Sequence, residues 1–109
     1  MQSGRLIHRV IVMQFAIQED QYGEDEETWT EIGSRLGHVI YGKGAERREA
    51  AMKQASQSAT FQFRMDALTR AIAVKDRLVF AGTDWDVAGV APNVPRRGWI
   101  EFTAIGAKR

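Results

Sequence analysis

Residues 77–90 read Arg-Leu-Val-Phe-Ala-Gly-Thr-Asp-Trp-Asp-Val-Ala-Gly-Val, and this stretch decides the fold. Two apolar runs meet across its Ala-Gly-Thr-Asp segment, where Gly82 can adopt the positive φ of a tight turn and Asp84 can bond its own backbone. Beyond the turn, Trp85 and Val87 alternate with polar or small residues, which places both on one face of a strand. The stretch therefore predicts a β-hairpin with one face in the core.

The same alternation recurs in other short segments of the chain. Phe61 and Phe63 alternate with polar residues, as do Ile100 and Phe102. Several short strands must then share one small core, so we expect a mainly β fold: a small antiparallel barrel or sandwich. Besides the hairpin, strands are expected at residues 5–15, 29–41, 59–65 and 99–104, and residues 66–75 and 91–98 should connect them. Gly33 and Gly37 mark expected bulges or bends in the second of these strands.

Composition limits the class of protein. A chain of 109 residues with 44% hydrophobic content fits a single domain, here residues 1–109, that buries roughly 65% of its unfolded surface. It contains no cysteine, and its net charge of +1 argues against a dedicated sequence-reading nucleic-acid binder. No apolar run approaches the length of a membrane span, and the N-terminus lacks a signal-peptide core. We therefore expect a soluble protein without a membrane partner.

The first expected strand is apolar on both faces. Val10 and Val12 share one face, while Ile11 and Met13 share the other. Such a strand is either enclosed in a barrel or covered by a neighbouring subunit. Trp99 lies on the face of its strand opposite Ile100 and Phe102, which suggests a boundary or an interface. The predicted subunit interface consists of Trp99, Ile11 and Met13.

Residues 19–27 are rich in carboxylates and are predicted to form a loop. The spacing of a calcium-binding loop is absent from this stretch. Adjacent carboxylates on a turn usually repel one another and stay solvated, which favours a solvated hairpin loop. The alternative is a loop that docks to a basic surface. The candidate docking loop comprises Glu24, Asp25, Glu26 and Glu27.

Residues 45–58 differ in kind, because they are rich in helix formers and contain no β-branched residue. The apolar stripe is mostly alanine, so an isolated helix would be marginal in water and could be ordered by contact with another chain. An ordinary surface helix is the alternative. We expect a short helix or long loop inserted between strands at about residues 42–58.

No catalytic constellation emerges from the sequence. There is no thiol, no supported Ser-His-Asp set and no metal-ligand spacing, and His8 and His38 have no partner nearby in the sequence. Residues 42–44 read Gly-Lys-Gly but lack the remainder of a phosphate loop. We therefore predict a protein that is not an enzyme and needs no cofactor or metal.

A series of short motifs, in order along almost the whole chain, resembles the phage head-tail joining family. Each motif is weak alone, whereas their order and spacing together are fairly specific. The motifs are GRLIHRVIV at 4–12, DQYG at 20–23 with Trp29 following, GAE at 44–46 with AAMKQA at 50–55, FRM at 63–65, DRLVF at 76–80, Gly82, WDV at 85–87 and RRGWIEF at 96–102.

The resemblance implies a head-closure, or stopper, protein of a tailed phage, prophage or gene transfer agent. Members have a small β-barrel and assemble as a ring beneath the portal. The implied partners are further copies of the chain, a portal or adaptor ring above, tail-terminator or tail proteins below, and packaged double-stranded DNA. The implied location is the neck of the virion, after synthesis in the bacterial cytoplasm.

The resemblance also assigns a role to residues 42–58, which occupy the place of a loop that reaches into the ring's channel. The predicted DNA-facing residues are Lys43, Arg47, Arg48 and Lys53, with Gly42 and Gly44 as the hinge. A monomeric barrel that binds single-stranded nucleic acid is the alternative function. It is disfavoured because Trp85 and Phe63 fall on inferred core faces instead of forming stacking platforms.

Overall fold

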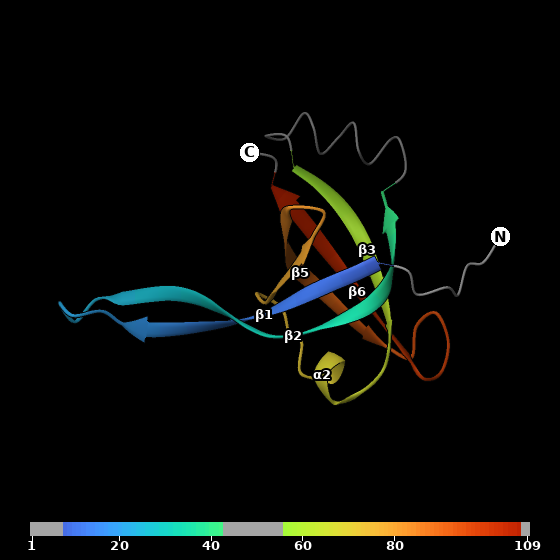
Figure 1. Ribbon diagram of the computed structural model, residues 1–109, viewed down its shortest axis with the longest axis horizontal. Helices are drawn as coiled ribbons and strands as arrows, with labels where there is room; N and C mark the ends of the chain where they lie inside the picture. Colours follow the sequence, from blue (N-terminus) through green and yellow to red (C-terminus); the bar gives the residue numbers. More distant parts are fainter. Residues whose placement is uncertain (1–7, 43–55, 108–109) are drawn as a thin grey trace.

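A computed structural model of the chain describes residues 8–42 and 56–107. The described residues form an antiparallel sheet in the order β1-β2-β3-β6-β5-β4, and β4 pairs back onto β1, so the sheet closes into a barrel (Figure 1). The predicted mainly β, small antiparallel barrel is therefore confirmed. The elements are β1 His8–Glu19, β2 Asp25–Tyr41, β3 Ser56–Arg64, α2 Ala67–Arg70, β4 Arg77–Phe80, β5 Thr83–Pro92 and β6 Trp99–Ala107.

The central hairpin forms where the sequence places it. β4 pairs with β5 across a two-residue turn in which Ala81 and Gly82 both have positive φ, 55° and 74°. Two positive φ angles in succession give a turn whose twist matches that of the flanking strands. Trp85 and Val87 are 1% and 2% exposed, so the predicted core face is confirmed.

The core inside the barrel is built around aromatic rings. Phe61 lies next to Phe63, Phe80 and Trp85, with ring centroids 6.5, 6.2 and 5.7 Å away, and the last two contacts are edge-on. Edge-on and offset contacts suit the charge distribution of aromatic rings. The buried core comprises Val10, Val12, Ala59, Phe61, Phe63, Ile72, Leu78, Trp85, Val87, Ile100, Phe102 and Ala104.

The two glycines expected to bend β2 play different roles. The register between β1 and β2 shifts between Val12 and Met13, opposite Gly33, whose φ is 152°. This is the predicted bulge. At Gly37, which pairs with His8, the register between β1 and β2 does not shift, so of the predicted bulge or bend the bulge is absent at this position. Gly37 instead provides space, because a Cβ at this position would lie 2.5 Å from Cε1 of Phe63.

Beyond the bulge, β1 and β2 leave the barrel as a two-stranded arm, which projects to the left in Figure 1. β1 pairs with β4 only at residues 11–13, and β2 pairs with β3 only at residues 38–41. Outside these short contacts the two strands pair only with each other, out to Glu19 and Asp25. The structure thus has two parts: a closed barrel with a core, and an arm without one.

The root of the arm is fixed by Asp76, the residue before β4. This carboxylate is 4% exposed and accepts hydrogen bonds from the backbone N–H groups of Phe15 and Ala73, at 2.9 and 2.8 Å. The contact with Phe15 ends the ladder between β1 and β4. On the other arm strand, the Trp29 indole N–H donates to the Lys75 carbonyl at 2.9 Å. The guanidinium carbon of Arg77 lies 3.5 Å from the centroid of the same indole ring.

Asp76→Ala should therefore destabilise the chain by about 1–3 kcal/mol, because it leaves two backbone N–H groups at the arm root without their acceptor. Urea denaturation would measure this loss. Asp86→Ala is the matched control: Asp86 pairs with Arg77 at 2.8 Å but its side chain is 58% exposed, so its loss should cost under about 1 kcal/mol. Equal losses in the two variants would contradict the anchoring role.

Other element boundaries differ from the sequence expectation. Residues 66–75 were expected to be a loop or short turn, and they contain α2, whose N-cap Asp66 accepts from the Thr69 N–H while the Thr69 hydroxyl accepts from the Asp66 N–H. This reciprocal cap explains how four residues hold a helical turn. β3 begins at Ser56 instead of residue 59, and β6 continues to Ala107 instead of residue 104.

Candidate functional site

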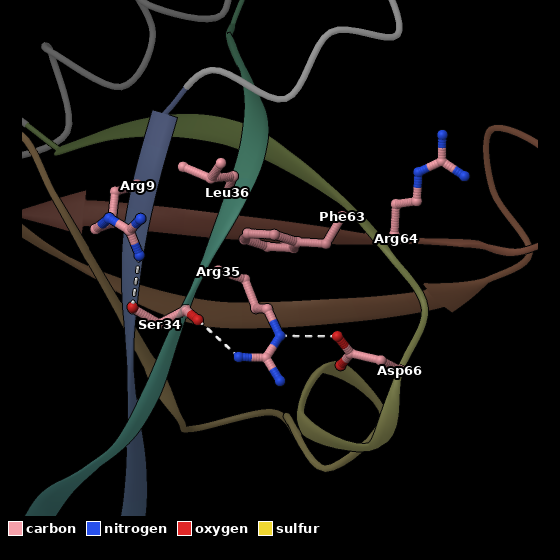
Figure 2. Close-up of a pocket in the computed structure, with 7 residues that line it drawn as sticks. All are labelled: Arg9, Ser34, Arg35, Leu36, Phe63, Arg64 and Asp66. Atoms are coloured by element: carbon pink, nitrogen blue, oxygen red, sulfur yellow. Dashed lines mark hydrogen bonds and ion pairs between the residues drawn. The ribbon is translucent and has the colours of Figure 1, made fainter.

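A groove of about 340 Å³ on the barrel is lined by three arginines (Figure 2). Arg9 comes from β1, Arg35 from β2 and Arg64 from β3. The same groove has an apolar part, formed by Leu36 and Phe63. Leu36 is 44% exposed. We call this surface, completed by Ser34 and Asp66, the arginine groove.

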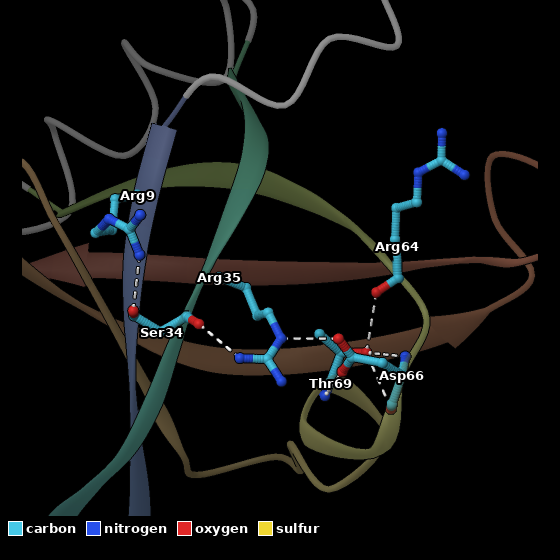
Figure 3. Close-up of polar contacts among 6 residues, drawn as sticks. All are labelled: Arg9, Ser34, Arg35, Arg64, Asp66 and Thr69. Atoms are coloured by element: carbon cyan, nitrogen blue, oxygen red, sulfur yellow. Dashed lines mark hydrogen bonds and ion pairs between the residues drawn. The ribbon is translucent and has the colours of Figure 1, made fainter.

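Only one of the three arginines has an acidic partner among the described residues. Arg35 donates from Nε to Asp66 at 2.7 Å and from Nη1 to the Ser34 carbonyl at 2.8 Å (Figure 3). Arg9 donates to the Ser34 hydroxyl at 3.0 Å, which leaves most of its five N–H donors open within the described chain. The groove therefore carries two cations beyond the neutral Arg35–Asp66 pair.

Asp66 links the groove to α2 and is held ionised. Burial raises the pKa of its carboxyl, but the hydrogen bond from the Thr69 N–H, the hydrogen bond and charge of Arg35, and the Thr69 hydroxyl outweigh it, so the pKa is lowered overall. Folding thus favours the charged form. This contribution to stability is present above the pKa of the unfolded chain and is lost as pH falls through the lower folded pKa.

Replacing Asp66 by Asn should therefore reduce stability near neutral pH more than at acidic pH. The difference in unfolding free energy between the wild type and Asp66→Asn should shrink as pH falls from about 5 through about 3.9, the ordinary Asp pKa, and below. Denaturant titrations at several pH values would measure it. In an Arg35→Gln background the convergence should be smaller, and a pH-independent difference would contradict the assignment.

Trp99 lies on the outer face of the sheet, as the alternation predicts, but it is only 4% exposed. The guanidinium carbons of Arg64 and Arg96 lie 5.2 and 5.0 Å from its ring centroid, so two cations cover the indole. The surface at this position is therefore formed by the two arginine side chains, and the Trp99 ring lies beneath them. Ile11 and Met13, the other predicted interface residues, are partly buried and pair with Val79 and Arg77 of β4.

The acidic stretch is a hairpin turn with strand residues on both sides. Asp25, Glu26 and Glu27 belong to β2 and pair with β1, while the turn itself occupies residues 20–24. Asp20 stabilises this turn by accepting from the N–H groups of Tyr22 and Glu24 at 2.8 and 2.9 Å. The predicted docking residues therefore stand at the far end of the arm, which we call the acidic tip, residues 19–27.

The predicted channel segment falls largely outside the described residues. Of its named residues, Gly42 is described, whereas Lys43, Gly44, Arg47, Arg48 and Lys53 are not. The Gly42 N–H donates to the Ser58 carbonyl at 3.1 Å, so the chain leaves the barrel and re-enters it at neighbouring points. Residues 56–58, expected to belong to the insertion, are instead the start of β3.

Sequence reasoning missed the arginine groove. Its arginines are more than 25 residues apart in sequence, and the pairing of Arg9 with Leu36 brings the first two strands together. Only knowledge of the strand register could have revealed it. Within residues 8–42 and 56–107, no group of His, Asp and Glu could hold a metal ion, and no helix is long and apolar enough to span a membrane.

Comparisons with known proteins agree with this architecture. Residues 1–107 match the phage head completion protein family. The fold is similar to the solution structure of a protein from Shigella flexneri 2a, with a TM-score of 0.70, 21% identity and 95% of each chain covered. It is also similar to a chain in the virion of a native gene transfer agent particle, with a TM-score of 0.65, 21% identity and 93% and 94% covered.

A search of curated proteins finds no match. The family match nevertheless spans nearly the whole sequence and agrees with the resemblance carried by the ordered motifs. The chain therefore belongs to the phage head completion protein family, and it is a structural component of the virion.

Proposed function

We propose that the chain is the subunit of a head-closure ring that lies between the portal or adaptor and the tail, retains packaged DNA and provides the surface on which the tail docks. The observation that carries this proposal is the family match over residues 1–107. The fold supports it, because a closed barrel is a rigid body from which an arm and an insertion can extend to neighbours.

Residues 42–55, between β2 and β3, are the part proposed to act in the channel. Lys43, Arg47, Arg48 and Lys53 would meet DNA phosphates, a contact that needs cations but reads no bases. Gly42 and Gly44 would serve as the hinge. The bond between Gly42 and Ser58 favours this role, because it lets the insertion move without opening the sheet.

The outer face of β1 is proposed to contact the next subunit of the ring. Ile11 and Met13 lie on it, and Trp99 contributes through the arginines that cover it. Head-to-tail contacts in a closed ring can each be weak, since closure adds avidity. The free chain can then stay monomeric until it assembles on the particle.

Deleting the gene tests the proposal. Particles without this subunit should package DNA, then lose it, and should carry no tails, whereas a plasmid copy should restore filled and tailed particles. Encapsidated DNA and tailed particles would be counted after nuclease treatment. Filled, tailed particles from the deletion strain would refute the head-closure role.

Neutralising the acidic tip should slow assembly in a salt-dependent way. Exposed charge pairs contribute only about 0–1 kcal/mol each, so Glu24, Asp25, Glu26 and Glu27 would steer docking more than they fix affinity. Changing all four to Gln or Asn should reduce the rate of incorporation into particles more at low than at high salt. The same reduction at both salt concentrations would rule out an electrostatic role.

A further inference from the structure

We infer that the arginine groove of one subunit receives the acidic tip of a neighbouring copy. This inference rests on the proposed ring and names the contact that joins its subunits. Each chain carries one groove and one tip, so a head-to-tail arrangement would satisfy both in every copy of a closed ring. The occupant is therefore a second copy of this chain.

Charge separation within the chain is the first support. Residues 19–27 contain six carboxylates and no basic residue, so the rest of the chain, with 15 basic and 8 acidic residues, has a net charge of +7. No ion pair involves the tip carboxylates within the described residues. A chain whose tip has a net negative charge and whose remainder has a net positive charge is attracted to further copies in a head-to-tail sense.

The chemistry of the groove is the second support. Arg9 and Arg64 lack a carboxylate partner among the described residues, while Arg35 already pairs with Asp66. Guanidinium groups bind carboxylates through two parallel N–H bonds. The groove also exposes Leu36, and the tip exposes Tyr22 at 79%. An aromatic ring flanked by acids matches an apolar patch flanked by arginines.

These features favour a protein segment over a DNA backbone. A row of phosphates offers nothing apolar to cover the exposed side chain of Leu36. Docking would also stabilise the arm. A two-stranded ribbon that pairs only with itself is marginally stable in water, so contact with a rigid barrel would order it.

The tip of a chain lies too far from the groove of the same chain to contact it. Nine residue-to-residue steps of β2 separate Asp25 from Ser34, and at about 3.3 Å per step they put the tip about 30 Å along the strand from its own groove. The arm strands stay paired over this length, which prevents the tip from folding back. Any contact between tip and groove is therefore a contact between chains.

Disulfide trapping tests the contact directly, because the natural chain has no cysteine. Tyr22→Cys with Leu36→Cys should give a ladder of covalent oligomers under mild oxidation, in purified concentrated protein and in particles. A disulfide needs Cα atoms within about 7 Å, so it cannot form within one chain. The control pairs Tyr22→Cys with Val90→Cys. Val90 is 39% exposed, close to the 44% of Leu36, but lies on β5, across the barrel from β2.

The expected yield of cross-linked chains is at least tenfold higher for the Leu36 pair than for the Val90 pair. Adding Arg9→Glu should lower that yield severalfold at low salt, and adding Glu24→Arg to the same chain should restore it. No ladder, or equal ladders from both pairs, would overturn the inference. Weaker binding of duplex DNA by Arg9→Glu, together with an absent ladder, would assign the groove to DNA instead.

The outcome separates this inference from the proposed function. If the cysteine chain enters filled, tailed particles and forms no ladder, the contact is wrong while the head-closure role stands. If the ladder forms in solution but the chain is absent from particles, the contact stands and the head-closure role fails.

Discussion

Removing residues 45–54 should leave the isolated barrel folded while particles built from it fail to retain DNA. Gly42, Lys43, Gly44 and Ala55 would then join β2 to β3 as a four-residue loop, a length that hairpins also use. The deletion removes none of the described strand or core residues, and the hydrogen bond between Gly42 and Ser58 can be kept. Thermal unfolding of the purified chain should remain cooperative, whereas nuclease-protected DNA in particles should fall at least tenfold.

A matched variant shows whether DNA retention depends on the size of the segment or on its positive charges. Changing Lys43, Arg47, Arg48 and Lys53 to Gln keeps the length of the segment but removes its cations. Loss of DNA from this variant as well would assign the effect to phosphate contacts, and retention would assign it to steric closure. Stable, filled and tailed particles from the deletion would contradict the channel role and leave the segment as a surface element or a clamp between subunits.

Trp85→Ala should have the largest effect on stability of any substitution considered. The indole is 1% exposed, meets Phe61 edge-on, and packs so closely on Gly106 that a Cβ there would lie 2.8 Å from its ring. Truncating a buried aromatic costs about 3–5 kcal/mol through lost burial and the cavity that remains. That is a large part of the about 5–15 kcal/mol that stabilises a domain.

Urea denaturation at 25 °C would measure the change, with Tyr22→Ala as the matched control. Tyr22 is also an aromatic residue but stands 79% exposed on the acidic tip, so its loss should change the stability of the monomer by less than about 0.5 kcal/mol. A small effect at Trp85 would mean that the barrel is not held together by the aromatic cluster.

Sequence reasoning found the parts of the fold that local patterns encode. Alternation placed Phe61, Phe63, Trp85 and Phe102 in the core, and all four are buried. The turn at Gly82 was readable because a two-residue hairpin turn needs positive φ. The closed barrel itself was one of two alternatives, since a strand apolar on both faces fits either enclosure or a subunit contact.

Features that depend on register could not be read from the sequence. Residues 19–27 were predicted to be a solvated hairpin loop, and a turn does occupy residues 20–24, but the pairing of β1 with β2 carries the ladder out to Glu19 and Asp25. Trp99 was expected at a boundary or an interface, and its burial within the chain depends on Arg64, across the ladder, and on Arg96 in a connecting segment. The arginine groove depends on three strands and has no local signature.

The most direct test of the head-closure role is a three-dimensional image of the purified particle in which this chain is located. If the chain is the head-closure subunit, copies of the barrel form a closed ring on the particle axis, between the portal and the tail, with residues 43–55 directed toward the channel. A filled and tailed particle that lacks the chain, or that carries it only on the outer surface of the capsid, would contradict the head-closure role.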